Sequence, residues 1–236
     1  MHTAIVTGGT RGIGYGIAQA LLESGAKVLI TGREATRVSE AVARLSAHAT
    51  GSGAVAGRVV DVRQRAAVDA LVADAVKEFG SLNTLINNAG VGHFLEVENT
   101  TDDDWARVID TNLTGVFYCS RAAIPAMRQA GGGWIINMAS LAGRNYFANA
   151  AAYCASKAGL VAFSEALMLE VRNDNIRVSV VMPGSVATEF SGPSNHQADE
   201  SWKLTAGDIA EVVMDLLRHP SRSLPSKVEI RPARTK

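Results

Sequence analysis

Short apolar runs alternate with longer amphipathic stretches along the chain, and this alternation restricts the fold more than any other feature of the sequence. The apolar runs predict strands at residues 3–7, 27–31, one ending at 61, 82–86, 134–139, 176–182 and 226–230. The stretches between them predict helices at residues 13–24, 35–48, 64–79, 102–129, 151–172 and 207–218. Strands that alternate with helices form a parallel sheet covered on both faces. We therefore expect a single doubly wound α/β domain over residues 1–236, with about seven strands.

The composition argues against several classes of protein. The 236 residues carry 23 basic and 23 acidic side chains, so no net field attracts nucleic acid or a membrane surface. Two cysteines make neither a disulfide framework nor a metal site, and the five histidines lack metal-ligand spacing. The strand pattern begins almost at Met1, which leaves no room for a signal peptide, and no apolar run reaches about 18 residues. We expect a soluble, cytoplasmic protein that acts on a small molecule without a metal.

Polar and glycine residues gather where the predicted strands end. They are Thr7-Gly8, Gly32-Arg33, Asp61, Asn87-Asn88-Ala89-Gly90, Ser140 and Pro183-Gly184. In a doubly wound sheet, ligands bind at the carboxyl ends of the strands, near the point where the strand order reverses. The sequence therefore predicts that these residues share one rim and form one site.

The turn between the first strand and the first helix is rich in glycine. Its predicted ligand-binding residues are Gly8, Thr10, Arg11, Gly12, Ile13 and Gly14. Glycine permits a tight turn and lets a pyrophosphate approach backbone N–H groups at the positive end of a helix. The spacing is Gly-x3-Gly-x-Gly rather than the commonest dinucleotide fingerprint, and a glycine-rich turn without a ligand is the alternative. Its place between a strand and a helix favours dinucleotide binding.

The end of the second strand indicates which dinucleotide binds. An acidic residue there would bind the ribose hydroxyls of NAD, whereas an arginine accommodates the 2′-phosphate of NADP. The segment reads Thr31-Gly32-Arg33, with no carboxylate before Glu34, and Arg11 supplies a second cation. In the alternative, Arg33 only caps the strand and Glu34 reverses the preference. The pattern favours NADPH, with NAD the second choice.

Tyr153 and Lys157 are four residues apart in a predicted helix, and Ser140 lies thirteen residues before the tyrosine. Side chains four apart lie on one face of a helix. A phenol and an ammonium on one face can share a substrate oxygen or a ribose. The alternative for this pair alone is a solvated helix face.

Together these residues resemble the short-chain dehydrogenase/reductase family over about residues 1–190, including its 3-oxoacyl-carrier-protein reductases, and so imply a Rossmann-like fold. The resemblance implies a catalytic tetrad of Asn112, Ser140, Tyr153 and Lys157. It also implies that Asp61 holds the adenine, Lys157 the nicotinamide ribose and Thr188 the nicotinamide carboxamide. The remaining cofactor contacts implied are Val62, Asn88, Ala89, Gly90, Tyr153, Pro183, Gly184 and Val186.

The chemistry also follows from the residue types. Reduction of a ketone or aldehyde by hydride from NADPH needs a proton for the nascent alkoxide, and a free tyrosine has a pKa near 10. We expect Lys157 and the oxidised cofactor to lower the pKa of Tyr153, and Ser140 to hold the carbonyl oxygen. The alternatives are an alcohol or sugar dehydrogenase that runs oxidatively, and a non-catalytic dinucleotide sensor.

The sequence gives the least information about the substrate and the partners. The candidate substrate residues are His93, Leu141, Tyr146, Phe190 and Trp202, with a short substrate-side loop at about 185–206. A plain loop histidine is the favoured interpretation of His93, and Arg144 either meets an anionic substrate or pins its loop. The C-terminal end departs from the glycine-rich tail of many relatives. Apolar faces on helices 102–129 and 151–172 predict a homodimer or homotetramer.

Overall fold

The computed structural model of the protein describes residues 3–191 and 200–234. Its strands are β1 (Thr3–Val6), β2 (Lys27–Gly32), β3 (Ala54–Val59), β4 (Thr84–Asn87), β5 (Gly133–Met138), β6 (Ile176–Pro183) and β7 (Lys227–Ile230). Its α-helices are α1 (Gly12–Glu23), α2 (Ala35–Ser46), α3 (Arg65–Phe79), α4 (Asp102–Ile109), α5 (Gly115–Gln129), α6 (Ala151–Val171) and α7 (Ala206–Arg218). Its shorter helical turns are η1 (Val97–Asn99), η2 (Asp110–Thr114), η3 (Leu141–Gly143), η4 (Arg172–Asp174) and η5 (Glu189–Ser191).

Within the described ranges, the seven strands form one sheet in the order β3-β2-β1-β4-β5-β6-β7, and every neighbouring pair is parallel. The chain moves outward from β1 to β3 and then returns to the centre at β4. The order therefore reverses between β1 and β4, which is where a doubly wound sheet binds its ligands. The α/β fold predicted from the alternating pattern is confirmed.

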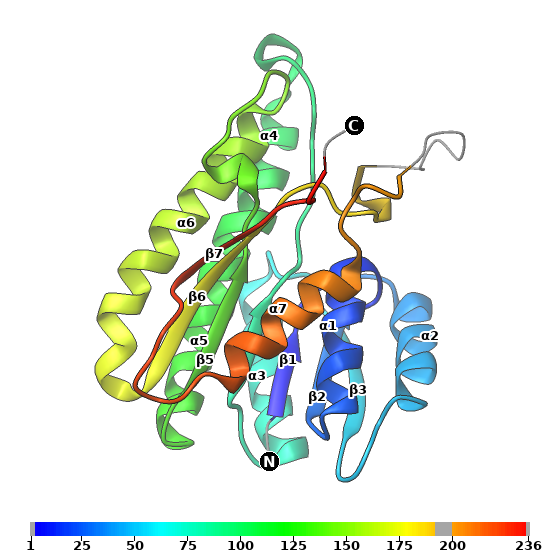
Figure 1. Cartoon of the computed structure of the whole chain (residues 1–236), viewed down its shortest axis with the longest axis vertical. Coiled ribbons are helices and arrows are strands. Elements are labelled where there is room, and N and C mark those ends of the chain that lie inside the picture. Colours follow the sequence, from blue (N-terminus) through cyan, green and yellow to red (C-terminus); the bar gives the residue numbers. More distant parts are fainter. Residues whose placement is uncertain (1–2, 192–199, 235–236) are drawn as a thin grey trace.

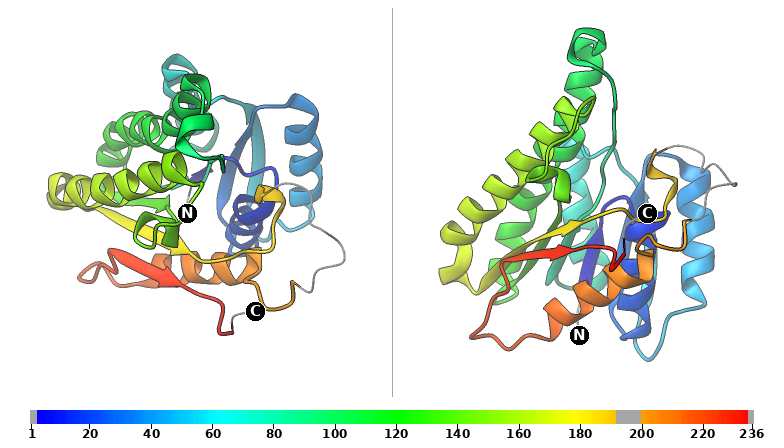
Figure 2. Two further views of the ribbon diagram at one scale, coloured as in Figure 1. Left: turned by 90° about the horizontal axis from the view of Figure 1, so that it is seen from above. Right: turned by 45° about the horizontal axis from the view of Figure 1, so that its top comes forward.

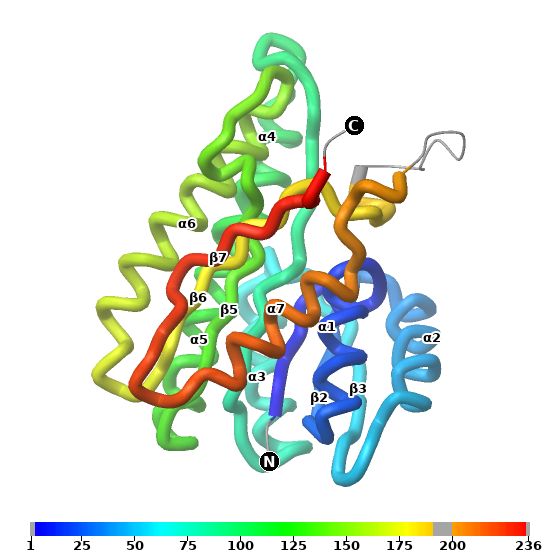
Figure 3. Tube along the Cα trace, in the orientation of Figure 1, coloured from blue at the N-terminus to red at the C-terminus, as the bar shows by residue number. Residues whose placement is uncertain are grey.

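Helices cover both faces of the sheet because successive residues of a strand point to opposite sides. Ala4 and Val6 of β1 pack into a cluster with residues of α1, α2 and α7. Ile5, between them, packs into a second cluster with residues of α3, α5 and α6. Figure 1 shows α1 and α7 over one face and α5 and α6 over the other, and Figure 2 shows the two layers from above. Figure 3 shows the red segment of β7 running beside β6 along the edge of the sheet.

Several elements differ from their predicted bounds by one or two residues, and one element differs in kind. The expected helix over 102–129 is two α-helices, α4 and α5, joined by the π-helical turn η2, which carries Asn112. A π-helical turn accommodates an extra residue within a helix and frequently lies at a functional site. The third strand ends at Val59 instead of Asp61.

The substrate-side loop expected at 185–206 is described in part, because residues 192–199 lie outside the described ranges. Its two described ends meet: Ala187 N donates to Leu204 O at 2.8 Å, and Leu204 N donates to Ser185 O at 3.0 Å. No helix in the described part of the chain combines the length and the apolar character needed to cross a membrane.

Candidate active site

A cavity of about 920 Å³ opens at the carboxyl ends of the strands. Of the site residues predicted from the sequence, all line this cavity except Gly14, His93, Asn112 and Tyr146. The cavity extends from Arg33, which follows β2, to Arg231, which follows β7. The expectation that the polar strand ends share one rim is therefore met by their positions.

Close packing explains why the turn after β1 needs glycine. Gly8 has a φ of 65°, and a Cβ added to it would lie 2.9 Å from the Cα of Ala89. A Cβ on Gly14 would lie 2.4 Å from Asn88 Nδ2. That same amide nitrogen donates to the carbonyl oxygens of Thr7 and Gly8 at 3.0 and 3.1 Å. Gly14 therefore packs beneath the cavity wall and allows Asn88 to hold the turn in place.

The N-terminus of α1 faces the cavity with its first backbone N–H groups uncapped. Arg11 is the N-cap residue, its side chain makes no capping hydrogen bond, and the first turn contains no acidic residue. The first N–H groups of a helix lack intrahelical acceptors and carry the positive end of the helix dipole. The turn from Gly12 to Gly14 therefore fits a pyrophosphate.

Guanidinium groups dominate the end of the cavity beside β2. Arg33 makes no ion pair within residues 3–191 and 200–234, whereas Glu34, which could have favoured NAD, accepts from Arg37 Nε at 2.9 Å. Arg11 Nη1 is 2.6 Å from Glu189 Oε2, so its charge is shared. Asp61 is bound by Arg63, whose hydrogen bonds hold the pKa of that carboxyl below its usual value. Neither Arg37 nor Arg63 was predicted from the sequence to belong to the site.

Ser140, Tyr153 and Lys157 come together near the middle of the rim. Ser140 follows β5, while Tyr153 and Lys157 lie in the first two turns of α6. The Ser140 hydroxyl interacts with the Tyr153 phenol and lowers the pKa of that phenol. Lys157 is buried, and its Nζ donates to the carbonyl oxygen of Met138 at 2.8 Å. The buried ammonium lies 5.8 Å from the centre of the Tyr153 ring.

Burial sets the direction in which the pKa values of Tyr153 and Lys157 shift. Burial raises the pKa of Tyr153 above its usual value, and the hydrogen bond with Ser140 only opposes this effect. Burial also lowers the pKa of Lys157 to about 8. In the protein chain by itself, the pKa of Tyr153 is therefore raised rather than lowered, because removal of the phenol from water is the larger effect. The expectation that Lys157 and the oxidised cofactor together lower this pKa stays a prediction.

Asn112 lies just beneath the cavity wall rather than on it. Its Oδ1 accepts from Val91 N at 2.8 Å, and its Nδ2 donates to Val91 O at 2.9 Å and to Ser156 Oγ at 3.0 Å. The π-helical turn η2 thus connects the segment after β4 to α6. The water relay that the family resemblance assigns to Asn112 stays a prediction.

Aromatic side chains surround the reacting phenol. The Tyr153 ring is 5.6 Å from the ring of Phe94 and 5.8 Å from that of Phe190, centre to centre. Phe147 stacks on Phe94 at 6.2 Å. Leu141, Phe147, Phe190 and Trp202 line the cavity as expected, whereas Phe94 was missed. This end of the cavity fits an apolar or aromatic group.

Comparison with known proteins decides the family. The model of the family described as short chain dehydrogenase matches residues 2–199. The chain belongs to the short-chain dehydrogenase family. Within the relatives, an uncharacterised oxidoreductase from Staphylococcus saprophyticus is 33% identical over 229 residues, 97% of this chain and 96% of the relative. A 3-oxoacyl-[acyl-carrier-protein] reductase from Chlamydia trachomatis is 36% identical over 200 residues, 85% of this chain and 80% of the relative.

Solved structures of short-chain dehydrogenases show the same fold. A metagenomic short-chain oxidoreductase crystallised in complex with NADP superposes with a TM-score of 0.85 at 34% identity. The match covers 98% of this chain and 97% of that structure. The chain is therefore an oxidoreductase of the short-chain dehydrogenase family.

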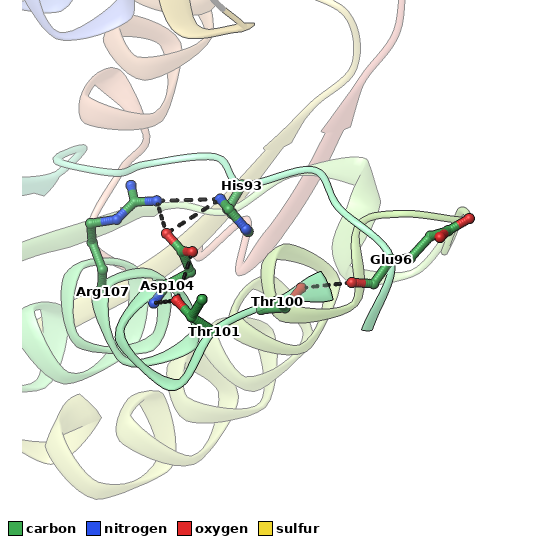
Figure 4. Close-up of polar contacts among 6 residues, drawn as sticks. All are labelled: His93, Glu96, Thr100, Thr101, Asp104 and Arg107. Carbon is green, nitrogen blue, oxygen red and sulfur yellow. Dashed lines mark hydrogen bonds and ion pairs between the residues drawn. The ribbon is translucent and has the colours of Figure 1, made fainter. Parts of the chain in front are cut away.

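His93 of this short-chain dehydrogenase contacts two charged side chains of α4. Its Nδ1 is 3.3 Å from Arg107 Nη2 and 3.6 Å from Asp104 Oδ1, beside the start of α4 (Figure 4). Thr101 is the N-cap residue of α4: its hydroxyl oxygen accepts from Asp104 N, and the hydroxyl donates to Asp104 Oδ2. The hydrogen bonds from Arg107 and Thr101 hold the pKa of the Asp104 carboxyl below its usual value. His93 does not line the cavity, and its contacts with Asp104 and Arg107 fit the favoured interpretation of a loop histidine; contact with the substrate stays a prediction.

The structure also shows where Tyr146 and Arg144, between Ser140 and Tyr153, lie relative to the cavity. Tyr146 is 69% exposed and lies outside the cavity lining, so the structure gives its assignment to the substrate no support. Arg144 Nη1 donates to Glu229 Oε1 at 2.6 Å, which pins its loop to β7. An aromatic residue in an irregular segment gives no periodic signal of direction, which is why Phe147 and Tyr146 could not be distinguished from the sequence.

Proposed function

We propose that this short-chain dehydrogenase transfers a hydride from NADPH to a ketone or aldehyde, with Tyr153 as the proton donor. The observation that carries the proposal is that Ser140, Tyr153 and Lys157 line the same part of the cavity wall, with the Lys157 ammonium buried and held by Met138 O. When bound, NADPH supplies the hydride. The side chains on this rim then have to position a carbonyl oxygen and deliver one proton.

The roles of the three side chains follow from their donors. Ser140 and Tyr153 present hydroxyl groups to the same point, where both can donate to a carbonyl oxygen and polarise it. Tyr153 then passes its proton to that oxygen as negative charge develops there. Lys157 uses one of its three N–H donors on Met138 O, which leaves others for a ribose hydroxyl. Its positive charge opposes protonation of a phenolate beside it.

The preference for NADPH over NADH is supported by the charges at the β2 end of the cavity. Arg33 is unpaired among the described residues, and the carboxylate of Glu34 is held by Arg37. A 2′-phosphate accepts charge-assisted hydrogen bonds from guanidinium groups, and these are the stronger kind. The metagenomic relative was crystallised with NADP.

A panel of ketones and aldehydes tested with NADPH and with NADH distinguishes the proposal from its alternatives. We expect carbonyl-dependent NADPH oxidation in the wild type, and in Tyr153→Phe a kcat lower by about a hundredfold or more, the scale of lost acid–base catalysis. The Kd of NADPH should not change, because the substitution removes only the hydroxyl group. Absorbance follows NADPH oxidation, and fluorescence titration gives the Kd of NADPH. Near-normal turnover in Tyr153→Phe would refute the role of the phenol.

The matched control is Tyr146→Phe, which removes a hydroxyl from an exposed tyrosine outside the cavity lining. We expect its turnover to equal that of the wild type. Absence of NADPH oxidation across the whole panel, together with measurable NADPH binding, would instead favour a sensor.

A further inference from the structure

The last strand brings an arginine to the active-site rim. Ile230 ends β7 beside Pro183 of β6, and Gly184 N donates to Ile230 O at 2.8 Å. The next residue, Arg231, therefore emerges at the carboxyl end of the sheet and lines the cavity together with Pro232. Figure 3 shows this red segment rising beside β6 to the rim. The motifs that the chain shares with the family end before this segment and do not include Arg231.

Arg231, Arg144 and Glu229 together carry a net positive charge. Glu229 Oε2 accepts from Arg231 Nη2 at 2.8 Å, and Glu229 Oε1 accepts from Arg144 Nη1 at 2.6 Å. The hydrogen bond from Arg231, followed by that from Arg144, holds the pKa of Glu229 below its usual value. The carboxylate thus stays ionised, and two guanidinium groups face one carboxylate. Neither Glu229 nor Arg144 lines the cavity, so the charge that a ligand meets is that of Arg231.

The guanidinium group is held in position and keeps donors to spare. With its amide oxygen toward Arg231, Asn145 accepts from Nη1 and Nη2 at 3.3 Å. Asn145 also lines the cavity, and its backbone N–H donates to Leu141 O at 2.8 Å, next to Ser140. Arginine has five N–H donors in a planar fork that matches a carboxylate. Glu229 and Asn145 therefore orient the group without using all its donors.

The sheet separates Arg231 from the phosphate-binding end. Arg33 follows β2 and Arg231 follows β7, five strand spacings apart in the sheet order, or about 24 Å at 4.8 Å a spacing. Ser140 follows β5, only two spacings from β7, or about 10 Å. An anionic group held by Arg231 would therefore belong to the molecule whose carbonyl meets Ser140. The other cation at this end, Lys203, is paired with Glu200 at 2.5 Å.

We propose that Arg231 binds the carboxylate of the carbonyl substrate. The substrate class is then a keto acid or aldehyde acid with an apolar or aromatic body. That body lies against Phe94, Phe147 and Phe190, and the carboxylate accepts from an N–H group of Arg231 that Glu229 and Asn145 do not use. This inference rests on the proposed carbonyl reduction and names its substrate class.

The test compares an aryl keto acid with its methyl ester in NADPH-oxidation assays. We expect the wild type to favour the acid by about tenfold in kcat/KM, the scale of a charge-assisted hydrogen bond at a partly exposed site. Arg231→Gln should abolish this preference and leave the ester rate and the KM of NADPH unchanged. Arg144 remains as a partner of Glu229 in that variant, so no carboxylate is left unpaired. An acid-to-ester ratio unchanged by Arg231→Gln would overturn the proposal.

Two further variants separate charge recognition from structure. Arg222→Gln removes an exposed arginine that does not line the cavity, and it should keep the preference for the acid. Arg231→Lys keeps the charge without the planar fork, and it should retain part of the preference. The preference in the wild type should also weaken as salt concentration rises.

A binding measurement keeps this inference separate from the proposed reaction. If the wild type oxidises no NADPH with any carbonyl compound, the proposed reaction fails. The protein saturated with NADP is then titrated with the aryl hydroxy acid and with its amide, and the thermal unfolding midpoint is followed. A larger stabilisation by the acid that disappears in Arg231→Gln supports carboxylate binding by Arg231. Equal shifts for acid and amide would overturn it.

Discussion

Lys157 is the only charged side chain among the buried residues of the described chain. An ammonium withdrawn from water is costly unless hydrogen bonds compensate, and here the Met138 carbonyl oxygen provides one at 2.8 Å. Because of this cost, burial lowers the pKa of Lys157 to about 8. The position is therefore unfavourable for folding, which is expected of a residue kept for binding and catalysis.

The burial of Lys157 predicts a specific pH dependence of stability. Because its folded-state pKa lies below the ordinary value of 10.5, the unfolded chain binds more protons between about pH 8 and 10.5. The contribution of Lys157 to the free energy of unfolding therefore rises with pH across that window. Relative to Lys157→Met, the wild type should gain about 2 kcal/mol between pH 8 and pH 10 in urea unfolding. Parallel profiles for the two proteins would contradict the buried charge.

Arg33 should determine cofactor choice. Arg33→Ala removes the unpaired guanidinium beside β2, so the kcat/KM for NADPH should fall by about tenfold or more, while that for NADH changes little. The matched control is Arg172→Ala, an exposed arginine just after α6 that does not line the cavity. Steady-state kinetics with both cofactors measures the ratio. An NADPH-to-NADH ratio that is the same in Arg33→Ala and the wild type would exclude this role.

At the scale of elements, α6 has two functions on different faces. Its first turns carry Tyr153 and Lys157 toward the rim, and Leu160, Leu167 and Val171 are buried in the core. A further face, with Ala155, Ala162, Ala166 and Leu169, is exposed. With Gly159, the small residues Ala155, Ala162 and Ala166 are spaced three and four apart, which allows a second helix to approach closely. On α5, Phe117 is also exposed, in edge-to-face contact with Phe163.

We propose that these faces of α5 and α6 pair with a second copy of the chain. Ala162→Glu places a charge at an exposed helical position, so the single chain should still fold while the pairing is lost. Ala43→Glu on α2 is the matched control, since Ala43 is also exposed and helical. Light scattering after size exclusion should show a dimer or tetramer for the wild type and for Ala43→Glu, and a smaller species for Ala162→Glu. A monomeric wild type would exclude the pairing.

At the scale of the whole molecule, the strand order divides the work of the cavity. Strands β1 to β3 and the turn after β1 supply the uncapped helix end and the arginines suited to phosphates. Strands β4 to β7 supply Ser140, the aromatic wall and Arg231. The formal net charge is zero, yet guanidinium groups lie at both ends of one cavity. The zero net charge of the whole chain therefore gives no indication that both ends of this cavity carry positive groups.

The features of the site that sequence patterns do not reveal share a cause. Tyr146 and His93 lie in irregular segments, where no periodicity indicates which side chain faces the cavity. The break at Asp110–Thr114 carries Asn112, which donates to Val91 O and Ser156 Oγ, 21 and 44 residues away. The pKa of Tyr153 depends on how much of the phenol is buried, which residue type and helical spacing do not specify.

The sequence by itself determined the alternating strands and helices, the glycine-rich turn and the pairing of Tyr153 with Lys157 on one helix face. These features depend on backbone conformation and periodicity within about twenty residues, which local residue types encode. Only the tertiary structure decided which distant groups share the cavity. The pairing of β7 with β6 brings Arg231 to the rim, and the engagement of Glu34 and Glu229 by neighbouring arginines leaves that rim positive. Such contacts arise from packing between segments far apart in the chain, so local pattern could not reveal them.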